Sequence, residues 1–448
     1  MADPLTWHRL QFAFTIVYHY LFPQLTMGLA LLIVVFKGLS LRAGPNAEGW
    51  ASLSRFWIRL FGLNFAVGVV TGIPMEFQFG TNWARFTHLT GGVVGQTLAL
   101  EGLLAFMLES SFLAMLVFGE KKLGPRKHFA AAVALFIGSW MSGLFIVITN
   151  SFMQHPVGFT RDAEGVFALA SFWEFLLNPW ALAQYAHNQM ASLVTASFVV
   201  TAVGAFWLLR GTHVEAARLN IKAGTTAGLI ACIAVGFPTG DAQAKLVAKH
   251  QPAALAAMEG HFVSGPRAEI HLIGQPNVAA RRLDNPIGVP AVLSFLAFGR
   301  FNAEVVGLND IPEDQWPTSI ELLYYSFHVM VGLGTIFIGL MGLAALLRWR
   351  GWLEHRRSRP LLWALMLAFP FPYIANTAGW MTAELGRQPW LVYGLLRTAD
   401  GASPTVHAGD TLFTLIGFTG LYFVLGLTFL FLVGREVIHG PATEGAHA

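Results

Sequence analysis

The stretch LQFAFTIVYHYLFPQLTMGLALLIVVF (residues 10–36) is the clearest indication of the fold class of this chain. It carries no Asp, Glu, Lys or Arg and is longer than the roughly 20 apolar residues that a helix needs to cross a bilayer. Eight further stretches have a similar apolar character, at 56–79, 93–118, 128–153, 183–209, 220–239, 318–346, 361–384 and 410–434. We therefore expect an all-α integral membrane protein with nine transmembrane helices.

The composition supports this class and excludes others. Charged residues make up 12% of the chain, about half the share of a typical soluble domain. The alternating segments of about ten residues that mark an outer-membrane barrel are absent from the sequence. Cys232 is the one cysteine, so this chain alone can form neither a disulfide framework nor a cysteine-ligated cluster. The net charge is only +3, which argues against a nucleic-acid partner.

Lysine and arginine are unevenly divided between the short connecting loops. One set holds the basic residues at 37–55, 121–127, 210–222 and 348–359, and the alternate set holds only Arg85, Arg161, Arg387 and Arg397. Because basic loops stay in the cytoplasm, we expect the N-terminus outside and the C-terminus in the cytoplasm. No basic segment precedes the first apolar run, so we expect no cleaved signal peptide.

The long connection at 240–317 then emerges on the outer side, and its length indicates a functional loop or a small domain. The chain thus divides into three parts. Helices one to six occupy 1–239, the extracytoplasmic loop occupies 240–317, and helices seven to nine with a cytoplasmic tail occupy 318–448.

Several ionisable side chains lie inside the expected spans, where each is costly and by default a functional candidate. They are His19, Glu76, Glu101, Glu109, His187, Glu321, His328 and Glu384. The topology places His19, Glu101, His187, Glu384 and the nearby Met330 in the outer half of the membrane, which suggests one shared site or layer of sites. Taken singly, each histidine could be a packing residue, each glutamate could serve a transporter, and Met330 could be core filler.

Glu101 and Glu109 lie about 12 Å apart along a regular helix and roughly 80° apart around it. The pair could form steps of a proton relay, or one could bind a metal while the other feeds protons. Ser142, Gly143, Thr149, Asn150 and Ser151 give the fourth span a polar stripe. That stripe could continue such a path, or could simply pack against a neighbouring helix.

His, Met and Glu together suggest haem iron, because a His/Met pair gives a low-spin haem. The sequence has no C-x-x-C-H attachment motif. From the residues alone, a haem protein and an ion-coupled transporter both remain open.

Seven stretches resemble, in order, the first subunit of cytochrome bd-type quinol oxidases in its short quinol-loop form. They are RLQFAFTIVYHYLFPQLTMG (9–28), MEFQFGTNW (75–83), EGLLAFMLES (101–110), NSFMQHPVG (150–158), QPAALAAMEG (251–260), SFHVMVGLG (326–334) and GWMTAELGRQPW (379–390). The resemblance covers nearly the whole chain, and the last stretch is its most specific part. It implies the same nine-helix layout and the same long outer loop.

The resemblance implies three haems: a low-spin haem b, a high-spin haem b, and a haem d or a second high-spin haem b in its place. His187 and Met330 match the ligands of the low-spin haem. His19 and Glu101 match residues that bind one high-spin haem, and Glu384 matches the ligand of the other. Which high-spin haem occupies which place is left unassigned, because family members differ.

Other residues match family positions that take part in electron transfer, proton transfer and quinol oxidation. Trp380 matches a tryptophan between haems, and Arg9 and Arg387 match arginines near haem propionates. The positions on the family's proton route from the cytoplasm are Glu109, Ser142 and Asn150. Glu259 matches a glutamate implicated in quinol oxidation, where a carboxylate can accept the released proton. The alternative is that Glu259 is an ordinary solvated residue of the loop.

Two positions depart from the family pattern. Ala254 stands where many members have lysine, which puts the quinol site in doubt. His328 stands where many members have arginine beside the low-spin haem, and its charge there could depend on pH.

The activity implied is that of a respiratory terminal oxidase, which reduces O2 to water with electrons from ubiquinol or menaquinol and generates proton motive force without pumping. The family implies a second membrane subunit and the bacterial plasma (inner) membrane, and leaves small single-helix subunits open. Two alternatives remain: a related haem protein with altered or absent quinol oxidase activity, which Ala254 favours, and a non-haem transporter.

Overall fold

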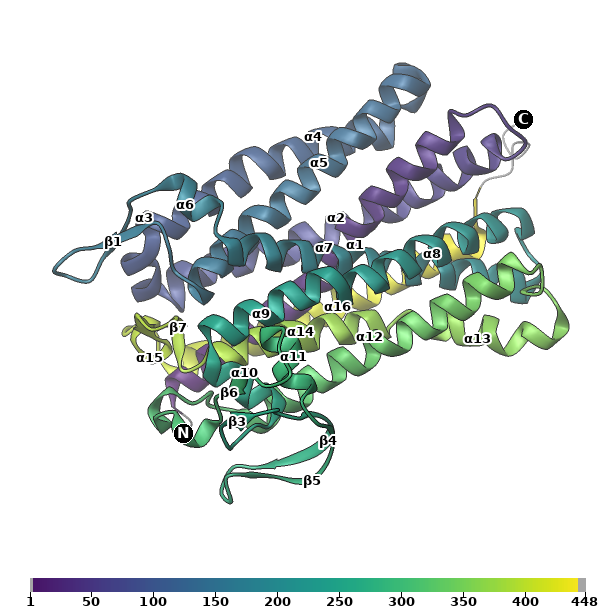
Figure 1. The fold of residues 1–448 in the computed structure, drawn as a ribbon. Coiled ribbons are helices and arrows are strands. Elements are labelled where there is room, and N and C mark those ends of the chain that lie inside the picture. Colours follow the sequence, from purple (N-terminus) through teal and green to yellow (C-terminus); the bar gives the residue numbers. More distant parts are fainter. Residues whose placement is uncertain (1–2, 442–448) are drawn as a thin grey trace.

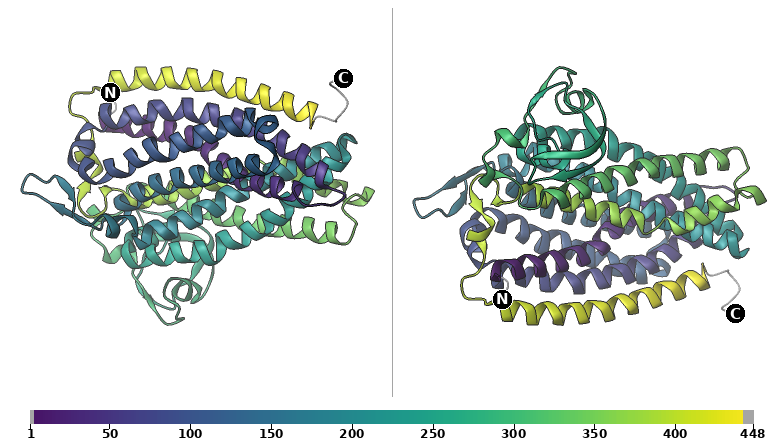
Figure 2. Two further views of the ribbon diagram at one scale, coloured as in Figure 1. Left: turned by 90° about the horizontal axis from the view of Figure 1, so that it is seen from above. Right: turned by 90° about the horizontal axis from the view of Figure 1, so that it is seen from below.

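The computed structural model describes residues 3–441 and shows a bundle of long helices that run roughly side by side (Figures 1 and 2). The long helices are α1 (Pro4–Ser40), α2 (Ala47–Thr81), α3 (Ala84–Leu100), α4 (Met107–Phe118), α5 (Glu120–Gln154), α7 (Pro179–Arg210), α8 (Val214–Ala234), α12 (Ile320–Trp349), α13 (Arg359–Leu367), α14 (Phe371–Arg387) and α16 (Ala408–His439). A π-helical turn, η1 (Glu101–Phe106), joins α3 to α4. Helix α1 begins at one end of the bundle, and α16 finishes at the other.

Eight helices in the described range are long and apolar enough to cross a membrane, and the bent pair α13–α14 makes nine if it counts as one span. The nine apolar stretches expected from the sequence are therefore helices. The pair is bent by 42°. Pro370 precedes α14 and Pro372 lies in its first turn, where a missing N–H is tolerated best.

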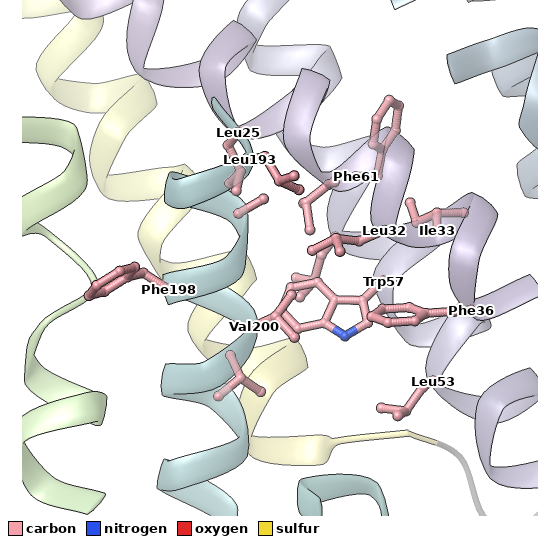
Figure 3. Packing of buried hydrophobic residues seen from close by; sticks show 14 of the residues in the cluster. Leu25, Leu32, Ile33, Phe36, Leu53, Trp57, Phe61, Leu193, Phe198 and Val200 are labelled. Carbon is pink, nitrogen blue, oxygen red and sulfur yellow. The ribbon is translucent and has the colours of Figure 1, made fainter. Parts of the chain in front are cut away.

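The centre of the bundle is an aromatic and aliphatic core contributed mainly by α1, α2 and α7 (Figure 3). The Trp57 indole lies there fully buried and donates a hydrogen bond to Asn220 Oδ1 of α8 at 2.9 Å. The apolar window of the span containing α7 is 78% buried, whereas that of α16 is 6% buried. Helix α7 is thus the central helix, and α16 is free to face lipid or another chain.

Gly28 lets α1 and α7 approach closely. A Cβ at this position would lie 2.3 Å from the Ser192 carbonyl oxygen, which belongs to the backbone and cannot rotate away. We expect Gly28→Val to destabilise the bundle by about 1–3 kcal/mol, the usual cost of overpacking a core. The thermal unfolding midpoint in detergent measures this. Gly44→Val is the control, because a Cβ there meets no atom within 4 Å; equal midpoints for both variants would contradict the assignment.

Residues 240–317 form a folded cap on the side of the bundle, near the end where α1 begins (Figure 2). Its elements are α9 (Asp241–His250), α10 (Pro252–Glu259), β3 (Gly265–Pro266), β4 (Ile270–Asn277), β5 (Arg282–Val289), α11 (Val292–Phe298), β6 (Glu304–Val305), η3 (Leu308–Asp310) and η4 (Glu313–Gln315). Strands β4 and β5 form an antiparallel hairpin, and β3 pairs with β6. Leu255 and Met258 of α10 pack with Leu323 of α12, so the cap is fastened to the membrane helices by its own apolar core.

A second π-helical turn, η2 (Val235–Gly240), separates α8 from α9 and is interrupted at Phe237. This break lies where the sequence places the start of the loop. The remaining elements are β1 (Phe159–Arg161), β2 (Phe167–Leu169), α6 (Phe172–Leu176), η5 (Arg356–Ser358), β7 (Trp390–Val392), β8 (Leu396–Arg397) and α15 (Thr398–Gly401). Strands β1 and β2 pair antiparallel, as do β7 and β8.

Candidate functional site

Helix α14 lies at the centre of the candidate site. It contacts α7 and α12, and α10 of the cap rests on both α12 and α14 (Figure 1). His187 is on α7, Met330 on α12, and Trp380 and Glu384 on α14. Four of the residues expected from the sequence therefore lie on α14 and on the two helices that it contacts.

The ring of His187 is oriented by the broken turn η2. Its Nδ1 lies 3.1 Å from the Val235 carbonyl oxygen. A hydrogen bond donated from Nδ1 to that carbonyl leaves Nε2 unprotonated and able to bind a metal. Gly240 lies beside the ring, because a Cβ there would come within 3.4 Å of its Cε1. The turn thus supplies both the orienting acceptor and the space for the ring.

Met330 lies against Gly379, the residue before Trp380, at the contact between α12 and α14. A Cβ at Gly379 would lie 2.8 Å from Met330 Sδ, so a larger residue there would displace the thioether. The neighbouring Trp380 ring meets the ring of Tyr20 edge-on at 5.7 Å. Tyr20 in turn donates a hydrogen bond to Asn188 Oδ1 at 2.5 Å. This chain of contacts links α14 through α1 to the residue next to His187.

The carboxylate of Glu384 accepts hydrogen bonds from two side-chain amides and one arginine. Its Oε1 accepts from Asn150 Nδ2 at 2.7 Å and from Gln154 Nε2 at 3.5 Å. Arg387, which is 2% exposed, donates to Glu384 Oε2. Gln184 Nε2 holds the Asn150 amide by donating to its Oδ1 at 2.8 Å. The structure therefore brings Glu384, Arg387 and Asn150 together, with Asn150 orienting the carboxylate.

His19 and Glu101 are each held by a hydroxyl group. His19 Nδ1 lies 3.2 Å from Thr71 Oγ1, and a Cβ at Gly72 would come within 2.9 Å of the ring. Ser142 of α5 donates to Glu101 Oε1 at 3.1 Å. Glu101 opens the π-helical turn η1, and such turns occur frequently at functional sites.

Glu109 is buried between α4 and α5, with the Ser139 hydroxyl against its carboxyl group. Both Glu101 and Glu109 therefore meet serines of α5 that are three residues apart. The π-helical turn lies between the two glutamates, so the angle of roughly 80° expected for a regular helix does not apply.

The remaining candidates are Glu76, Glu321 and Arg9, and Glu76 lies close enough to Glu101 to interact with it electrostatically. The side chains of Glu76 and Glu321 are exposed on the surface of the chain, and Arg9 is half-buried near the start of α1. The fourth-span residues Thr149 and Ser151 are buried, and Ser151 donates to Gln184 Oε1 at 2.9 Å.

The cap is joined directly to the Glu384 network. Gln251 Nε2, at the start of α10, donates to Gln154 Oε1 at 2.9 Å and to the Gln154 carbonyl oxygen at 2.8 Å. Ala254 is 4% exposed and packs against Gly386 of α14. Two small residues, Ala254 and Gly386, therefore let α10 lie close to α14. The lysine that many family members have at position 254 would need more space than this contact leaves.

At the other end of α10, Glu259 is 3% exposed, and its Oε2 has no hydrogen-bond partner in the described part of the chain. Tyr324 of α12 is 1% exposed and packs against the backbone of Gly260, and its hydroxyl is likewise unpartnered within residues 3–441. A buried polar group without a partner costs about 1–3 kcal/mol. Burial raises the pKa of Glu259 to about 8. Two unsatisfied groups beside each other indicate a polar ligand.

His328 fastens the cap hairpin to α12. Its Nε2 lies 2.7 Å from the His271 carbonyl oxygen of β4, and its Nδ1 lies 2.8 Å from the Tyr324 carbonyl oxygen. The ring also stacks on Tyr324 at 3.9 Å. A neutral imidazole can donate to only one of these two carbonyls. The His328 ring thus lies between strand β4 of the cap and Tyr324 of α12.

The donor set fits the haem groups that the sequence resemblance implies. The unprotonated Nε2 of His187 and the thioether of Met330 are ligand types of low-spin haem. Gly72, Gly240 and Gly379 leave space for His19, His187 and Met330, respectively. Arg387 Nε is buried and lacks an acceptor among the described residues, which suits an anionic group such as a propionate.

Several contacts of the site were not expected from the sequence. Gln154, Gln184 and Gln251 connect Glu384 to the cap, and Tyr20 and Tyr324 supply hydroxyl groups. Gln154 and Gln251 stand in two of the seven matching stretches. Polar side chains at these positions of otherwise apolar segments are the signal that could have singled them out.

Comparisons with known proteins find relatives over nearly the whole chain. The family profile described as cytochrome bd terminal oxidase subunit I matches residues 7–441. The chain is 35% identical to cytochrome bd ubiquinol oxidase subunit 1 of Bacillus subtilis (strain 168), covering 98% of this chain and 94% of that one. It is 30% identical to cytochrome bd-II ubiquinol oxidase subunit 1 of Escherichia coli (strain K12), covering 99% and 98%. A solved structure of bd oxidase from Geobacillus thermodenitrificans superposes with a TM-score of 0.89 at 30% identity, covering 98% and 99%.

Proposed function

The chain belongs to the cytochrome bd terminal oxidase subunit I family, and on that premise we propose that it is the haem-bearing catalytic subunit of a quinol oxidase. Two quinol molecules give up four electrons and four protons, and one O2 takes up four of each to form two molecules of water. The family match excludes the alternative that this protein is a non-haem transporter. The quinol species stays open.

We assign the haem-holding residues as follows. His187 and Met330 hold the low-spin haem b, His19 and Glu101 hold one high-spin haem, and Glu384 holds the other. When bound, these groups supply electron transfer and the site of O2 reduction. The high-spin pair comprises a haem b and either a haem d or a second haem b. Arg387 and Arg9 would neutralise haem propionates, His328 would lie beside the low-spin haem, and Trp380 would aid electron transfer between the haems.

One observation carries the quinol-oxidising role: the buried, unpartnered Glu259 carboxyl lies in a cap that is hydrogen-bonded to the Glu384 network. Ionised Glu259 accepts a proton from a quinol hydroxyl as the electron leaves. The Tyr324 hydroxyl lies close enough to Glu259 to interact electrostatically, and it is available to bind the second quinol oxygen. Because both groups are buried, the cap must open for quinol to enter.

Proton uptake is assigned to the contact between α4 and α5. Glu109 receives protons from the cytoplasmic side and feeds them toward the haem that Glu101 would hold, with Ser139 and Ser142 as hydroxyl partners along α5. Asn150 orients Glu384 at the outer end of the same helix. Quinol protons leave on the outer side while those for water come from inside, so charge separates across the membrane without a pump.

This scheme requires the orientation that the basic loops indicate, with the N-terminus and the cap (240–317) outside and the C-terminus in the cytoplasm. The six helices of 1–239 and the three helices of 318–448 form the membrane part. We place the protein in the bacterial plasma (inner) membrane as one half of a heterodimer with a second membrane subunit. The exposed apolar side chains of α16, such as Phe413 and Phe431, can face lipid or that subunit.

Quinol oxidation should depend on pH through Glu259. Because burial raises the pKa of this carboxyl to about 8, most of it is protonated at neutral pH and cannot accept a proton. The rate at saturating quinol should rise by roughly tenfold per pH unit well below that value and level off above it. Glu259→Gln should abolish this dependence. A rate that is flat between about pH 6 and pH 8 would argue against Glu259 as the acceptor.

The raised pKa of Glu259 also affects the free energy of unfolding. Higher pH should lower this free energy, whereas it should increase the rate of quinol oxidation. Because the folded-state pKa of Glu259 lies above its ordinary value of 4.5, ionisation is easier in the unfolded chain. The stability penalty is therefore absent below about pH 4.5 and fully developed above about pH 8.

The haem assignment is tested by a dithionite-reduced minus air-oxidised visible spectrum of the purified complex. A red-shifted haem d band beside haem b bands supports the full assignment. Haem b bands alone would be consistent with the proposed ligands but would show that a second high-spin haem b is present instead of haem d. A preparation of intact complex without haem would overturn the proposal.

A further inference from the structure

A basic pocket lies at the end of the bundle opposite the cap. It has a volume of about 230 Å3, and Arg218, Lys222, Arg348 and Glu354 line it with the apolar Ile221 and Leu353. Arg218 lies about 25 Å along α8 from Val235, the acceptor for His187. The pocket is therefore separate from the proposed haem and quinol sites.

The charges in the pocket do not cancel. Arg218 Nε and Nη2 each donate to one Glu354 oxygen at 2.7 Å, and this pairing lowers the pKa of Glu354 below its ordinary value. One cation and one anion are thereby matched. Lys222 and Arg348 remain, and their charges favour an anion.

Arg348 has a donor left for such an anion. Its Nη2 donates to Thr226 Oγ1 at 3.0 Å, and its Nε is buried without an acceptor among the described residues. An unsatisfied N–H on a guanidinium is costly, and phosphate oxygens match the guanidinium fork well. Lys222 is exposed at the rim, where an ammonium group can add a second contact.

The surroundings favour a lipid as the source of the phosphate. Ile221 and Leu353 are 1% and 5% exposed, and both belong to an apolar cluster between α7, α8, α12 and α13. Trp349 and Trp352 are 77% and 52% exposed, with the Arg350 guanidinium over both rings. Exposed tryptophans mark the level of lipid head groups, and basic pockets between membrane helices bind anionic head groups.

We propose that this pocket binds the phosphate of an anionic phospholipid head group through Arg348 and Lys222. The proposal goes beyond the oxidase function and holds whether or not the haem and quinol assignments are correct. In the expected orientation, the pocket lies at the cytoplasmic surface of the membrane.

The test measures phosphatidylglycerol bound to the purified, haem-loaded complex by native mass spectrometry, with phosphatidylcholine as the neutral lipid. We expect Lys222→Gln and Arg348→Gln each to weaken phosphatidylglycerol binding by about tenfold, about 1.4 kcal/mol. Lys222 is exposed, so its replacement keeps the test valid even if Arg348→Gln folds poorly. Arg357→Gln is the matched control, because it removes an exposed arginine from η5 at the same end of the bundle.

Equal phosphatidylglycerol binding by Lys222→Gln, Arg357→Gln and the unaltered complex would overturn the proposal. Equal binding of phosphatidylcholine would also overturn it, since the pocket would then ignore charge. Displacement of the lipid by millimolar inorganic phosphate would show that the free anion is the ligand, and the lipid assignment would fail.

Discussion

Replacing Glu259 by glutamine is expected to lower quinol-driven oxygen uptake by about two to four orders of magnitude, the usual contribution of a positioned general base. Glutamine keeps the size of the side chain but cannot accept a proton. The carboxyl is 3% exposed and its Oε2 is unpartnered among the described residues, so the substitution removes no hydrogen bond of the folded chain at that oxygen. The measurement is oxygen uptake with excess quinol, together with the visible spectrum.

Glu304→Gln is the matched control, because Glu304 is an exposed glutamate of the same cap. It should leave the rate within about twofold, as expected for a surface substitution away from the reacting groups. The haem spectrum should be the same in both variants. Unchanged oxygen uptake by Glu259→Gln would remove Glu259 from the reaction and leave the cap without an identified proton acceptor.

Replacing His187 by alanine is expected to abolish the low-spin haem signal and reduce quinol-driven oxygen uptake to background. Imidazole is one of the two proposed iron ligands, and the Val235 carbonyl holds it in the metal-binding tautomer. The reduced-minus-oxidised spectrum measures the loss, and added free imidazole should restore part of the low-spin signal.

His88→Ala serves as the control for that experiment, since His88 is an exposed histidine on α3. The spectrum and the rate should stay as they are. A full low-spin signal in His187→Ala would assign the ligand to another residue. Loss of every haem would instead indicate that the variant fails to assemble, and Met330→Leu would then be the replacement that spares the His187 contacts.

The membrane architecture could be predicted from the sequence because it depends on local composition. A run of about 20 apolar residues is sufficient to identify a span, and residues 10–36 lie within α1 as expected. Helix ends were predicted less well: α1 starts at Pro4, because turns outside the hydrocarbon core need not be apolar. The family was also predicted correctly, since short ordered stretches such as GWMTAELGRQPW are specific in themselves.

The contacts within the site could not be predicted, because they join distant parts of the chain. Gln251 meets Gln154 across 97 positions, and Asn150 meets Glu384 across 234. Periodicity places a residue on a helix but does not specify its neighbour on another helix. The π-helical turn at Glu101 could not be predicted either, because the apolar sequence around it does not indicate a change of helix type. The roles of the individual site residues remain proposals.

Quinol-driven oxygen uptake by the purified complex in lipid vesicles decides whether the chain is part of a working quinol oxidase. We expect oxygen consumption that depends on added quinol, with one O2 consumed for two quinol molecules, and a membrane potential that develops across the vesicle membrane. A haem-loaded complex that consumes no oxygen with either ubiquinol or menaquinol would contradict this expectation. The chain would then be a family member that has lost quinol oxidation, as the alanine at position 254 allows.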